Sequence, residues 1–348
     1  MILAFTTPGD RMIKTMSGQS EATNRVNAAR TAIFCSTIIP TIGRATLARA
    51  VESVLAQVLS AAEFEIIVIN DSGTPLTVAA WQASARVQII ETNRRERSVA
   101  RNTGAVAARG KYLHFLDDDD WLAAGALERF YQLSQSTTAV WMYGITQLVD
   151  RQNQPLIQLR HGLSGNCFVQ AMAGEWIPLQ ASLVERNAFL RAGGFNPLIS
   201  GPEDIDLLRR MLLEAGLAET PQLVAYVAIG DAGSTTDYRR HTAGSRWSRE
   251  AIIDAAGAFQ RMRQSACSPF WQGRMLRLYL TSTTWNLQRR RFFSAASRCL
   301  FALRSALSAG TALFSPDYWK AVARSYESIT FEQGQEAARQ VGSTNRRD

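Results

Sequence analysis

Four consecutive aspartates stand directly after a short apolar run. Asp117 to Asp120 follow residues 112–116, whose composition is typical of a buried strand. In open parallel sheets ligands bind outside the carboxyl ends of the strands, and carboxylates crowded there repel one another. A divalent cation such as Mg²⁺ or Mn²⁺ relieves that repulsion and takes diphosphate oxygens as further ligands. Capping of a following helix would account for one or two aspartates, so we interpret the four as a metal site.

A second pair of acids opens a predicted helix. Glu203 and Asp204 follow Pro202 at the start of a helix expected over residues 203–215. From the residues alone, the favoured interpretation is that the pair complements the helix dipole. Nearby Asp206 is expected to be solvated.

The residues around both groups predict alternating strands and helices. Apolar runs predict strands at 32–39, 64–69, 87–90 and 112–116, and helical spacing predicts helices at 47–58 and 98–108. Farther along, we expect helices at 122–133 and 203–215 and strands at 140–148, 154–159 and 223–229. This alternation is typical of a parallel sheet with helices on both faces, which would bring the strand ends together at one edge.

Composition narrows the class of protein further. The chain has 348 residues and a formal net charge of +8, which favours anionic partners without choosing among them. Its four cysteines are scattered and form no CxxC pair, which argues against a zinc cluster and favours free thiols. No uncharged run reaches the roughly 18 residues that a spanning helix needs. The apolar stretch 292–314 is interrupted by Arg298 and Arg304, and it could lie on a membrane surface instead.

Several short motifs occur in a specific order. They are Ile39-Pro40-Thr41, Ile67-Val68-Ile69-Asn70-Asp71-Ser72-Gly73, Ala100-Arg101-Asn102-Thr103-Gly104, Phe115-Leu116-Asp117-Asp118-Asp119-Asp120, Gly193-Gly194-Phe195 and Glu203-Asp204. Over roughly residues 30–250 this order resembles the family 2 glycosyltransferases, bacterial inverting enzymes of the GT-A fold. The resemblance implies an α/β fold of the GT-A type, a nucleotide-diphospho-sugar transferase with a Rossmann-like mixed sheet. The residues beyond it predict a C-terminal helical extension.

The resemblance implies that some of the four aspartates are metal ligands. Asp117 and Asp119 would hold Mn²⁺ or Mg²⁺, with Asp119 as the direct ligand, and Asp118 would face the donor ribose or sugar. His241 either completes the metal shell or has a structural role, and both readings stay open.

The resemblance also implies a nucleotide site. Asp71 would contact the nucleobase, although it also suits a plain turn. Arg101 would border the nucleotide pocket, although it could lie on an exposed helix face. The other residues implied near the base or phosphates are Pro40, Thr41, Arg44 and Asn102.

In the family the Glu-Asp pair is catalytic. Asp204 would be the base that deprotonates the acceptor hydroxyl, with Glu203 beside it, and a single displacement would invert the anomeric configuration. Asn70 departs from the aspartate that many members carry. The Gln-x-x-Arg-Trp motif of processive synthases is absent, so we expect transfer of one sugar. A UDP-sugar is favoured as donor, and a saccharide or lipid-linked acceptor in cell-surface polysaccharide or glycoconjugate synthesis.

The chain divides into four expected parts: a disordered lead at 1–30, a transferase domain at 31–250, a helical extension at 251–335 and a polar tail at 336–348. By the resemblance, Trp176 and Gln180 are candidates to meet an acceptor sugar, and packing in the core is an equal alternative for Trp176. In the extension, Arg289 to Arg291 stand among aromatic residues, which suits an anionic membrane, a nucleic acid or a plain helical bundle. Nucleic acid is the least favoured because no recognised motif accompanies the charge.

Two other functions stay open as alternatives: a catalytically inactive nucleotide-sugar-binding module, and another nucleotide-sugar enzyme such as a nucleotidyltransferase. The latter lacks its expected Gly- and Lys-rich phosphate loop, since that position reads Pro40-Thr41-Ile42-Gly43-Arg44. The expected location is the cytoplasm, with peripheral contact on the inner face of the cell membrane left open.

Overall fold

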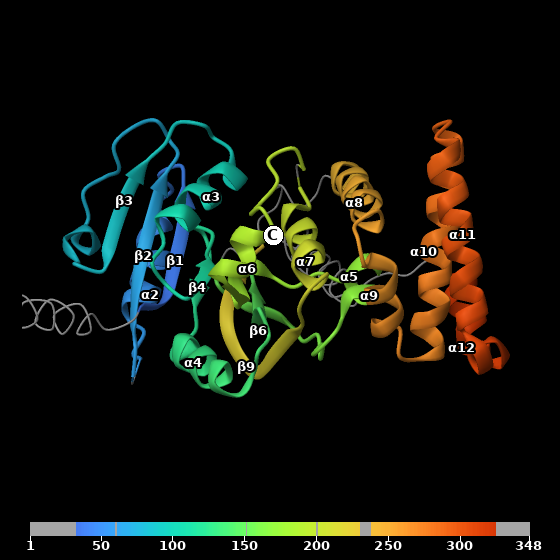
Figure 1. Ribbon diagram of the computed structural model, residues 1–348. Coiled ribbons are helices and arrows are strands. Elements are labelled where there is room, and N and C mark those ends of the chain that lie inside the picture. The colour runs from blue at the N-terminus through green and yellow to red at the C-terminus, as the bar shows by residue number, and fades with distance from the viewer. Residues whose placement is uncertain (1–32, 60, 151, 200, 230–237, 325–348) are drawn as a thin grey trace, which may run out of the picture.

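A computed structural model describes residues 33–324, except residues 60, 151, 200 and 230–237, and it leaves the side chains of 238–243 undescribed. The lead expected at 1–30 and the tail expected at 336–348 therefore lie outside the described residues. The rest forms a mixed sheet flanked by helices, with further helices beyond one end of it (Figure 1).

The sheet contains nine strands in the order β3-β2-β1-β4-β8-β6-β9-β5, with β7 paired to β6. Their bounds are β1 Ile33–Thr41, β2 Glu63–Asn70, β3 Val87–Glu91, β4 Tyr112–Phe115, β5 Trp121–Leu122, β6 Trp141–Val149, β7 Pro155–Leu159, β8 Ser182–Glu185 and β9 Leu217–Ala228. β3, β2, β1 and β4 are mutually parallel, as the alternating pattern predicted. β8 is antiparallel to both of its neighbours, which makes the sheet mixed.

The register of the parallel strands aligns their carboxyl ends. Thr41 lies opposite Asn70, and Ile38 lies opposite Phe115. The ladder continues past the strands, because the Asp71 amide donates to the Thr41 carbonyl at 2.8 Å. The turns after β1, β2 and β4 therefore share one edge of the sheet, and this edge holds the aspartates.

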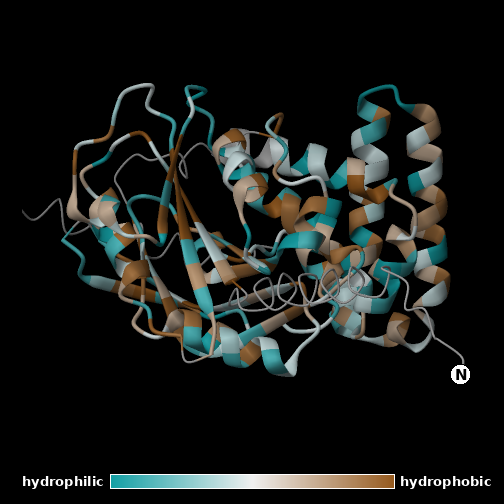
Figure 2. Ribbon diagram, turned by 60° about the vertical axis from the view of Figure 1, so that its left-hand side comes forward, coloured by the Kyte–Doolittle hydropathy of each residue, from teal (hydrophilic) through white to brown (hydrophobic). Residues whose placement is uncertain are grey.

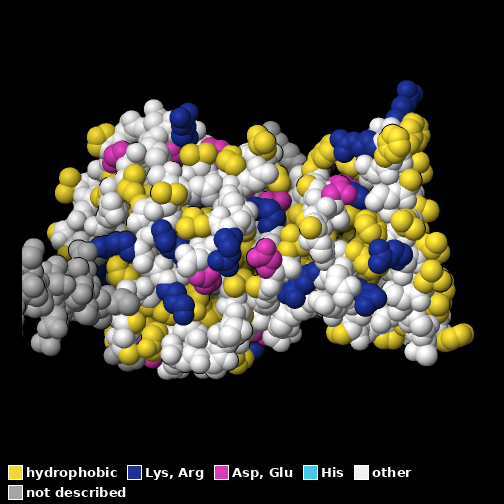
Figure 3. Space-filling view, in the orientation of Figure 1, with side chains coloured by type: hydrophobic (Ala, Val, Ile, Leu, Met, Phe, Trp, Pro, Cys, Tyr) yellow, Lys and Arg dark blue, Asp and Glu magenta, His cyan; other side chains and the backbone are white. Residues whose placement is uncertain are grey.

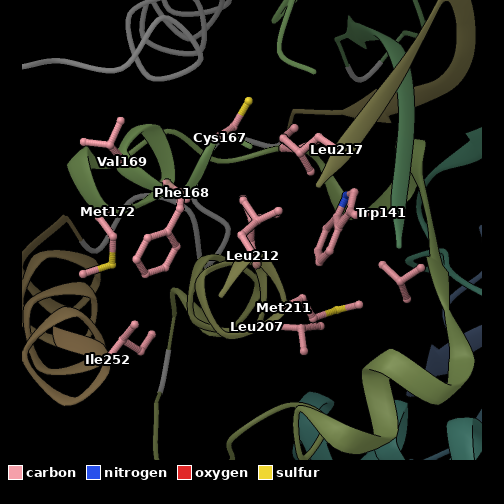
Figure 4. Close-up of a cluster of buried hydrophobic side chains, with 14 of the residues drawn as sticks. Trp141, Cys167, Phe168, Val169, Met172, Leu207, Met211, Leu212, Leu217 and Ile252 are labelled. Carbon is pink, nitrogen blue, oxygen red and sulfur yellow. The ribbon is translucent and has the colours of Figure 1, made fainter. Parts of the chain in front are cut away.

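Two separate hydrophobic clusters cover the two faces of the sheet. Helices α2 (Leu47–Leu55) and α4 (Ala126–Ser136) pack in one cluster with alternate residues of β1 and β2. The other cluster contains residues of α3 (Arg97–Ala107), α5 (Phe168–Ala173), α6 (Arg186–Arg191) and α7 (Glu203–Leu212). In Figure 4, Leu207, Met211 and Leu212 of α7 lie among Phe168, Trp141 and Ile252 from neighbouring elements. This packing fixes α7 and hence the acids at its first turn.

The second cluster continues into the C-terminal helices. These are α8 Tyr238–Ile253, α9 Ala258–Ser265, α10 Pro269–Gln288, α11 Phe292–Ser308 and α12 Pro316–Ala323. Residues as distant as Ile38 and Tyr318 belong to the same buried cluster. Figure 2 shows hydrophobic residues along the central strands and on the helices beside them. The helical extension is thus packed onto the sheet domain.

The main difference from the predicted elements follows the aspartates. A helix was expected from residue 122, but Trp121–Leu122 forms β5 against β9, and α4 begins only at Ala126. The Ala123 amide extends this pairing by donating to the Val224 carbonyl at 2.9 Å, and Gly125 then turns the chain with φ of 74°. Helical spacing is a local signal and cannot register such pairing with a distant strand. The short elements α5, β8 and β5 were not predicted.

Candidate functional site

The four aspartates occupy four different environments at the sheet edge. Asp117 accepts hydrogen bonds from Arg101 at 2.6 Å and from Gln180 at 2.8 Å, one on each carboxylate oxygen. Burial alone would raise the pKa of Asp117, but the charge and hydrogen bond of Arg101 outweigh it and hold that pKa below its ordinary value. Asp117 is therefore kept ionised by a fixed cation of the chain itself.

Asp118 and Asp119 share one arginine. Arg44 donates to Asp118 at 3.0 Å and to Asp119 at 2.8 Å, and the Thr41 hydroxyl donates to Asp118 at 2.6 Å. The pKa of Asp119 is raised, by burial first and by repulsion from Asp117 second. Burial is also the main reason why the pKa of Asp118 is raised. The side chain of Asp119 is 42% exposed, more than that of Asp117 at 30% or Asp118 at 5%. Asp119 is therefore the most accessible of these three carboxylates to a ligand.

Asp120 has a structural contact. Its side chain is 2% exposed and accepts a hydrogen bond from the Ala228 amide at 2.9 Å, which ties the end of β9 to the aspartate turn. Burial, followed by the charges of Asp117 and Asp119, raises the pKa of Asp120 well above its ordinary value. One of the four aspartates is thus explained without a ligand.

Arg101 joins the aspartates to the pair at the start of α7. It donates to Glu203 at 3.1 Å as well as to Asp117, and Arg97 lies 3.2 Å from the same Glu203 oxygen. Arg101 is 4% exposed, so the reading that placed it on an exposed helix face is wrong. Burial would lower the pKa of Arg101, but the negative charges of Asp117, Glu203 and Asp204 raise it above its ordinary value.

The two acids of α7 differ in exposure and contacts. Glu203 is 3% exposed and held by arginines, whereas Asp204 is half-buried and accepts from the Ile205 amide at 2.7 Å. Asp204 adjoins Glu203 in the first turn of α7, and its charge is among those that raise the pKa of Arg101. Asp206, which was expected to be solvated, is instead 3% exposed and pairs with Arg210 at 2.6 Å. That expectation was wrong because Asp206 lies on the packed face of α7.

Two residues implied in nucleotide binding hold the backbone of the chain. Asp71 accepts from the Thr92 hydroxyl at 2.8 Å and from the amides of Arg94 and Glu96 at 2.6 and 2.8 Å. Burial would raise the pKa of Asp71, but these hydrogen bonds lower it. A contact between Asp71 and the nucleobase stays a prediction.

Asn102 makes a two-way amide contact. It donates to the Phe195 carbonyl at 2.8 Å and accepts from the Phe195 amide at 2.9 Å. A side chain at Gly194 would collide with it, since an added Cβ would lie 2.6 Å from the Asn102 oxygen. The Ala-Arg-Asn and Gly-Gly-Phe motifs are therefore in direct contact, although Asn102 borders the nucleotide only as a prediction.

The remaining predicted residues lie as follows. Pro40 and Thr41 end β1 at the site edge, and the Thr41 hydroxyl contacts Asp118. The side chain of His241 is outside the described residues, so its metal role is untested. Gln180 was expected to meet an acceptor sugar, but in this structure it donates to Asp117.

Sequence reasoning missed a set of residues that position the acids. Arg49 donates to the Asp119 carbonyl at 2.7 Å and stacks over the Trp121 ring at 3.8 Å. His114 lies between the Thr37 hydroxyl at 3.2 Å and the Gln180 carbonyl at 2.9 Å, and burial lowers its pKa to about 4. The one feature of the sequence that could have indicated these residues was His114, a histidine within the strand that ends at the aspartates.

The acids fit a hard divalent cation. Within the described residues, no group of three or more His, Cys, Asp and Glu side chains is arranged to hold a metal ion. Mg²⁺, however, is commonly bound through one or two carboxylates and completed by waters and substrate phosphates. The Arg44 guanidinium already places positive charge between Asp118 and Asp119, so these carboxylates can stabilise a cation there. Asp119, with Asp118 or Asp117 beside it, would hold the ion.

Parts of this chain are similar to known proteins in sequence, and a larger part is similar in fold. Residues 36–167 match the family described as Glycosyl transferase family 2. Poly(ribitol-phosphate) beta-N-acetylglucosaminyltransferase TarP of Staphylococcus aureus is 33% identical over 119 residues, which cover 32% of this chain and 36% of TarP. Succinoglycan biosynthesis protein ExoO of Rhizobium meliloti is 37% identical over 98 residues, 27% of either chain. The chain thus spans only about a third of TarP and less of ExoO.

The crystal structure of S. aureus TarS 1-349 in complex with UDP-GlcNAc resembles the fold. It matches with a TM-score of 0.53 at 13% identity, over 67% of this chain and 71% of that one. The class is therefore a mixed α/β GT-A fold with additional C-terminal helices. Within that class, residues 36–167 are similar to glycosyl transferase family 2. Within the described part of the chain, every helix is too short or too polar to cross a membrane.

Proposed function

We propose that this protein transfers one sugar from a nucleotide diphosphate sugar to an acceptor hydroxyl, with inversion at the anomeric carbon. The observation that carries the proposal is Arg101, which contacts Asp117 at the sheet edge and Glu203 beside Asp204. One buried side chain thus ties a donor-side acid to an acceptor-side acid across two distant segments. A reaction with a leaving diphosphate and an attacking hydroxyl needs the donor-side acid and the acceptor-side acid in one site.

On the donor side, Asp119 and its neighbours would hold Mn²⁺ or Mg²⁺. When bound, the cation supplies positive charge that stabilises the diphosphate as it leaves. Arg44 adds charge of the chain itself, and its side chain is 50% exposed and able to follow a ligand. Arg49 and Thr41 hold the turn that carries the aspartates in place. Arg49 contacts the Asp119 carbonyl and Thr41 contacts the Asp118 carboxylate.

On the acceptor side, Asp204 is the proposed base. Its carboxylate takes the hydroxyl proton while the acceptor oxygen forms a bond to the anomeric carbon and the bond to the diphosphate oxygen breaks. Attack from the face opposite the diphosphate inverts the configuration in one step. Arg97 and Arg101 hold one carboxylate oxygen of Glu203, so Glu203 orients Arg101, and Asp204 remains as the proposed base.

The relatives support the chemical class of the substrates. TarP is named for transfer of N-acetylglucosamine to poly(ribitol-phosphate), ExoO for succinoglycan biosynthesis, and TarS has been crystallised with UDP-GlcNAc. For this chain we propose a UDP-sugar as donor and a saccharide or lipid-linked acceptor in polysaccharide or glycoconjugate synthesis.

The donor side is tested by Asp119→Asn. Removing the carboxylate charge should abolish Mn²⁺-dependent binding of UDP in isothermal titration calorimetry, because the cation loses its direct ligand. The matched control is Asp317→Asn, an exposed aspartate on α12, which should bind UDP like the wild type. Equal Mn²⁺-dependent heats for wild type and Asp119→Asn would contradict the donor assignment.

The acceptor side is tested by Asp204→Asn. A thermal-shift screen of nucleotide sugars with Mn²⁺ first selects the donor, and UDP release is then measured with saccharide acceptors. Loss of the base should lower kcat by about 100-fold or more while the donor affinity stays unchanged. Full turnover by this variant would remove Asp204 from the mechanism but leave the donor site intact.

A further inference from the structure

The outer face of α11 is apolar. Its exposed residues include Phe293, Leu300, Leu303 and Leu307, which are 95%, 57%, 55% and 74% exposed. Their spacing of seven, three and four residues places them on one side of the helix. Phe314, just beyond the helix, is 88% exposed. Large apolar side chains that gather on a surface mark an interaction site.

The inner face of the same helix is small and polar. Its buried residues are Ala295, Arg298, Ala302 and Ser305. Arg298 is 1% exposed and pairs with Asp254 at 2.6 Å. α11 therefore places a charge inward and leucines outward, the reverse of a helix that belongs on a water-exposed surface. Among residues 33–324 that the structure describes, no packing contact accounts for the outer leucines.

The turn between α10 and α11 is basic and aromatic. Arg289 lies 4.0 Å from the centre of the Trp285 ring, and Arg291 lies 4.9 Å from that of Trp247. Trp285 is buried, at 7% exposed, whereas Trp247 is 47% exposed. An exposed indole ring beside a guanidinium group suits the headgroup layer of a membrane, where apolar and charged surroundings meet. In Figure 3, hydrophobic side chains run along the edge of the helical extension, with basic ones at its upper end.

The charge of this region is one-sided. Residues 255–324 contain eleven Arg and Lys and a single acid, Asp317, whereas the whole chain has a net charge of +8. Residues 255–324 therefore carry a net charge of +10, eleven minus one, which exceeds the net charge of the whole chain. Such a surface attracts anionic lipid headgroups and opposes pairing with a second copy of itself, because two equally basic faces repel.

We propose that the outer face of α11 lies on the surface of an anionic phospholipid bilayer. The helix, about 25 Å long at 1.5 Å per residue, would lie parallel to the membrane plane with its leucines among the acyl chains. Arg289, Arg290 and Arg291 would contact the lipid phosphates at one end. This inference does not depend on the proposed sugar transfer.

Two exposed cysteines allow a direct test. Cys299 is exposed on α11, Cys267 is exposed just before α10, and the other two, Cys35 and Cys167, are buried. An environment-sensitive fluorophore on Cys299, in the full chain with Cys267→Ser, should shift to the blue with vesicles of phosphatidylcholine and phosphatidylglycerol. The same label on Cys267, with Cys299→Ser, should not shift. An equal response at both positions, or none at Cys299, overturns the proposal.

Flotation with the same vesicles tests whether the exposed leucines of α11 contribute to vesicle binding. The double variant Leu303→Ser/Leu307→Ser should lose about tenfold or more in vesicle affinity, because it removes two side chains from the acyl region. Val58→Ser/Val78→Ser is the control, since both valines are exposed on the sheet domain, at 76% and 90%. Circular dichroism checks that both variants are folded. Equal flotation of the two double variants overturns the proposal.

Two further experiments test whether the arginines contribute to vesicle binding and whether the outer face of α11 instead binds a second copy of the chain. Arg289→Gln/Arg290→Gln should lower the affinity by about fivefold for each charge removed, and pure phosphatidylcholine vesicles should bind the wild type weakly. Light scattering examines self-association. A wild-type dimer that Leu303→Ser/Leu307→Ser dissociates would assign the face to a second copy and overturn the membrane proposal.

Discussion

The sheet edge and the helical extension distribute their charges in opposite ways. At the sheet edge, charged groups converge on one place and pair there: Arg101 contacts Asp117 and Glu203, and Arg44 contacts Asp119. In the extension a charge is buried on α11, at Arg298, while leucines of the same helix face outward. The first region contains its own counter-charges and needs only a ligand. The second leaves an apolar surface exposed among the described residues, and we propose that a membrane covers it.

The largest stability effect should come from the buried arginine of the sheet edge. Arg101→Met leaves Glu203 buried without its closest cation, and such a broken buried pair costs about 3–5 kcal/mol. Urea unfolding measures the change. The control is Arg86→Met, whose pair with Glu63 is exposed on both sides and is worth less than about 1 kcal/mol. If both variants unfold at the same urea concentration, Arg101 does not hold the site together.

The corresponding change in the extension is Arg298→Met. It removes the partner of Asp254 and of Glu250, whose side chain is 5% exposed, and should cost about 3 kcal/mol. Lys320→Met on α12 is the control, because its pair with Asp317 is exposed. A cost of Arg298→Met no larger than that of the control would show that the buried charge is not required for the packing of α11.

Acid should weaken the sheet domain through His114. Burial lowers the pKa of His114 from 6.5 to about 4, so below pH 6.5 the unfolded chain takes up a proton that the folded one refuses. Stability is therefore complete above about pH 6.5 and falls toward pH 4 by up to about 1.4 kcal/mol per pH unit.

The matched variant for this pH effect is His114→Gln, which keeps a polar group but cannot titrate. Urea unfolding at a series of pH values should give a shallower acid slope for the variant than for the wild type. The slope does not vanish, because burial also lowers the pKa of His161 to about 4. Identical slopes would mean that His114 is not held neutral in the folded protein.

The smallest effect on stability is expected on the outer face of α11, where large apolar side chains are exposed. Leu303→Ser/Leu307→Ser should change the free energy of unfolding by less than about 0.5 kcal/mol per site, because both leucines face solvent. A loss of several kcal/mol in differential scanning calorimetry would instead show that the outer face of α11 is buried in the free protein. The comparison between the two regions would then fail.

Much of the sheet could be predicted from local pattern. The apolar runs that end at Thr41, Asn70 and Phe115 gave parallel strands whose carboxyl ends meet, and the aspartates follow the last of them. The pattern also gave α7 with Glu203 at its start. These predictions succeeded because strand burial and helix periodicity are properties of neighbouring residues.

Partners across the chain could not be predicted in this way. The sequence offered four equivalent aspartates, and the structure distinguishes them by contacts from Arg101, Arg44, Gln180 and Ala228. Asp206 was expected in solvent, yet Arg210 and the packed face of α7 bury it. β5 escaped notice because its two residues form a strand only against β9.

By itself, then, the amino-acid sequence determined where the acids stand along the chain, that they follow a buried strand and open a helix, and that the C-terminal segment is basic. Those properties depend on residue type and spacing. Only the tertiary structure decided that Arg101 links Asp117 to Glu203, that Asp120 is a structural contact, and that α11 turns its leucines outward. These depend on which segments pack together, and packing between segments far apart in the chain leaves no local signal.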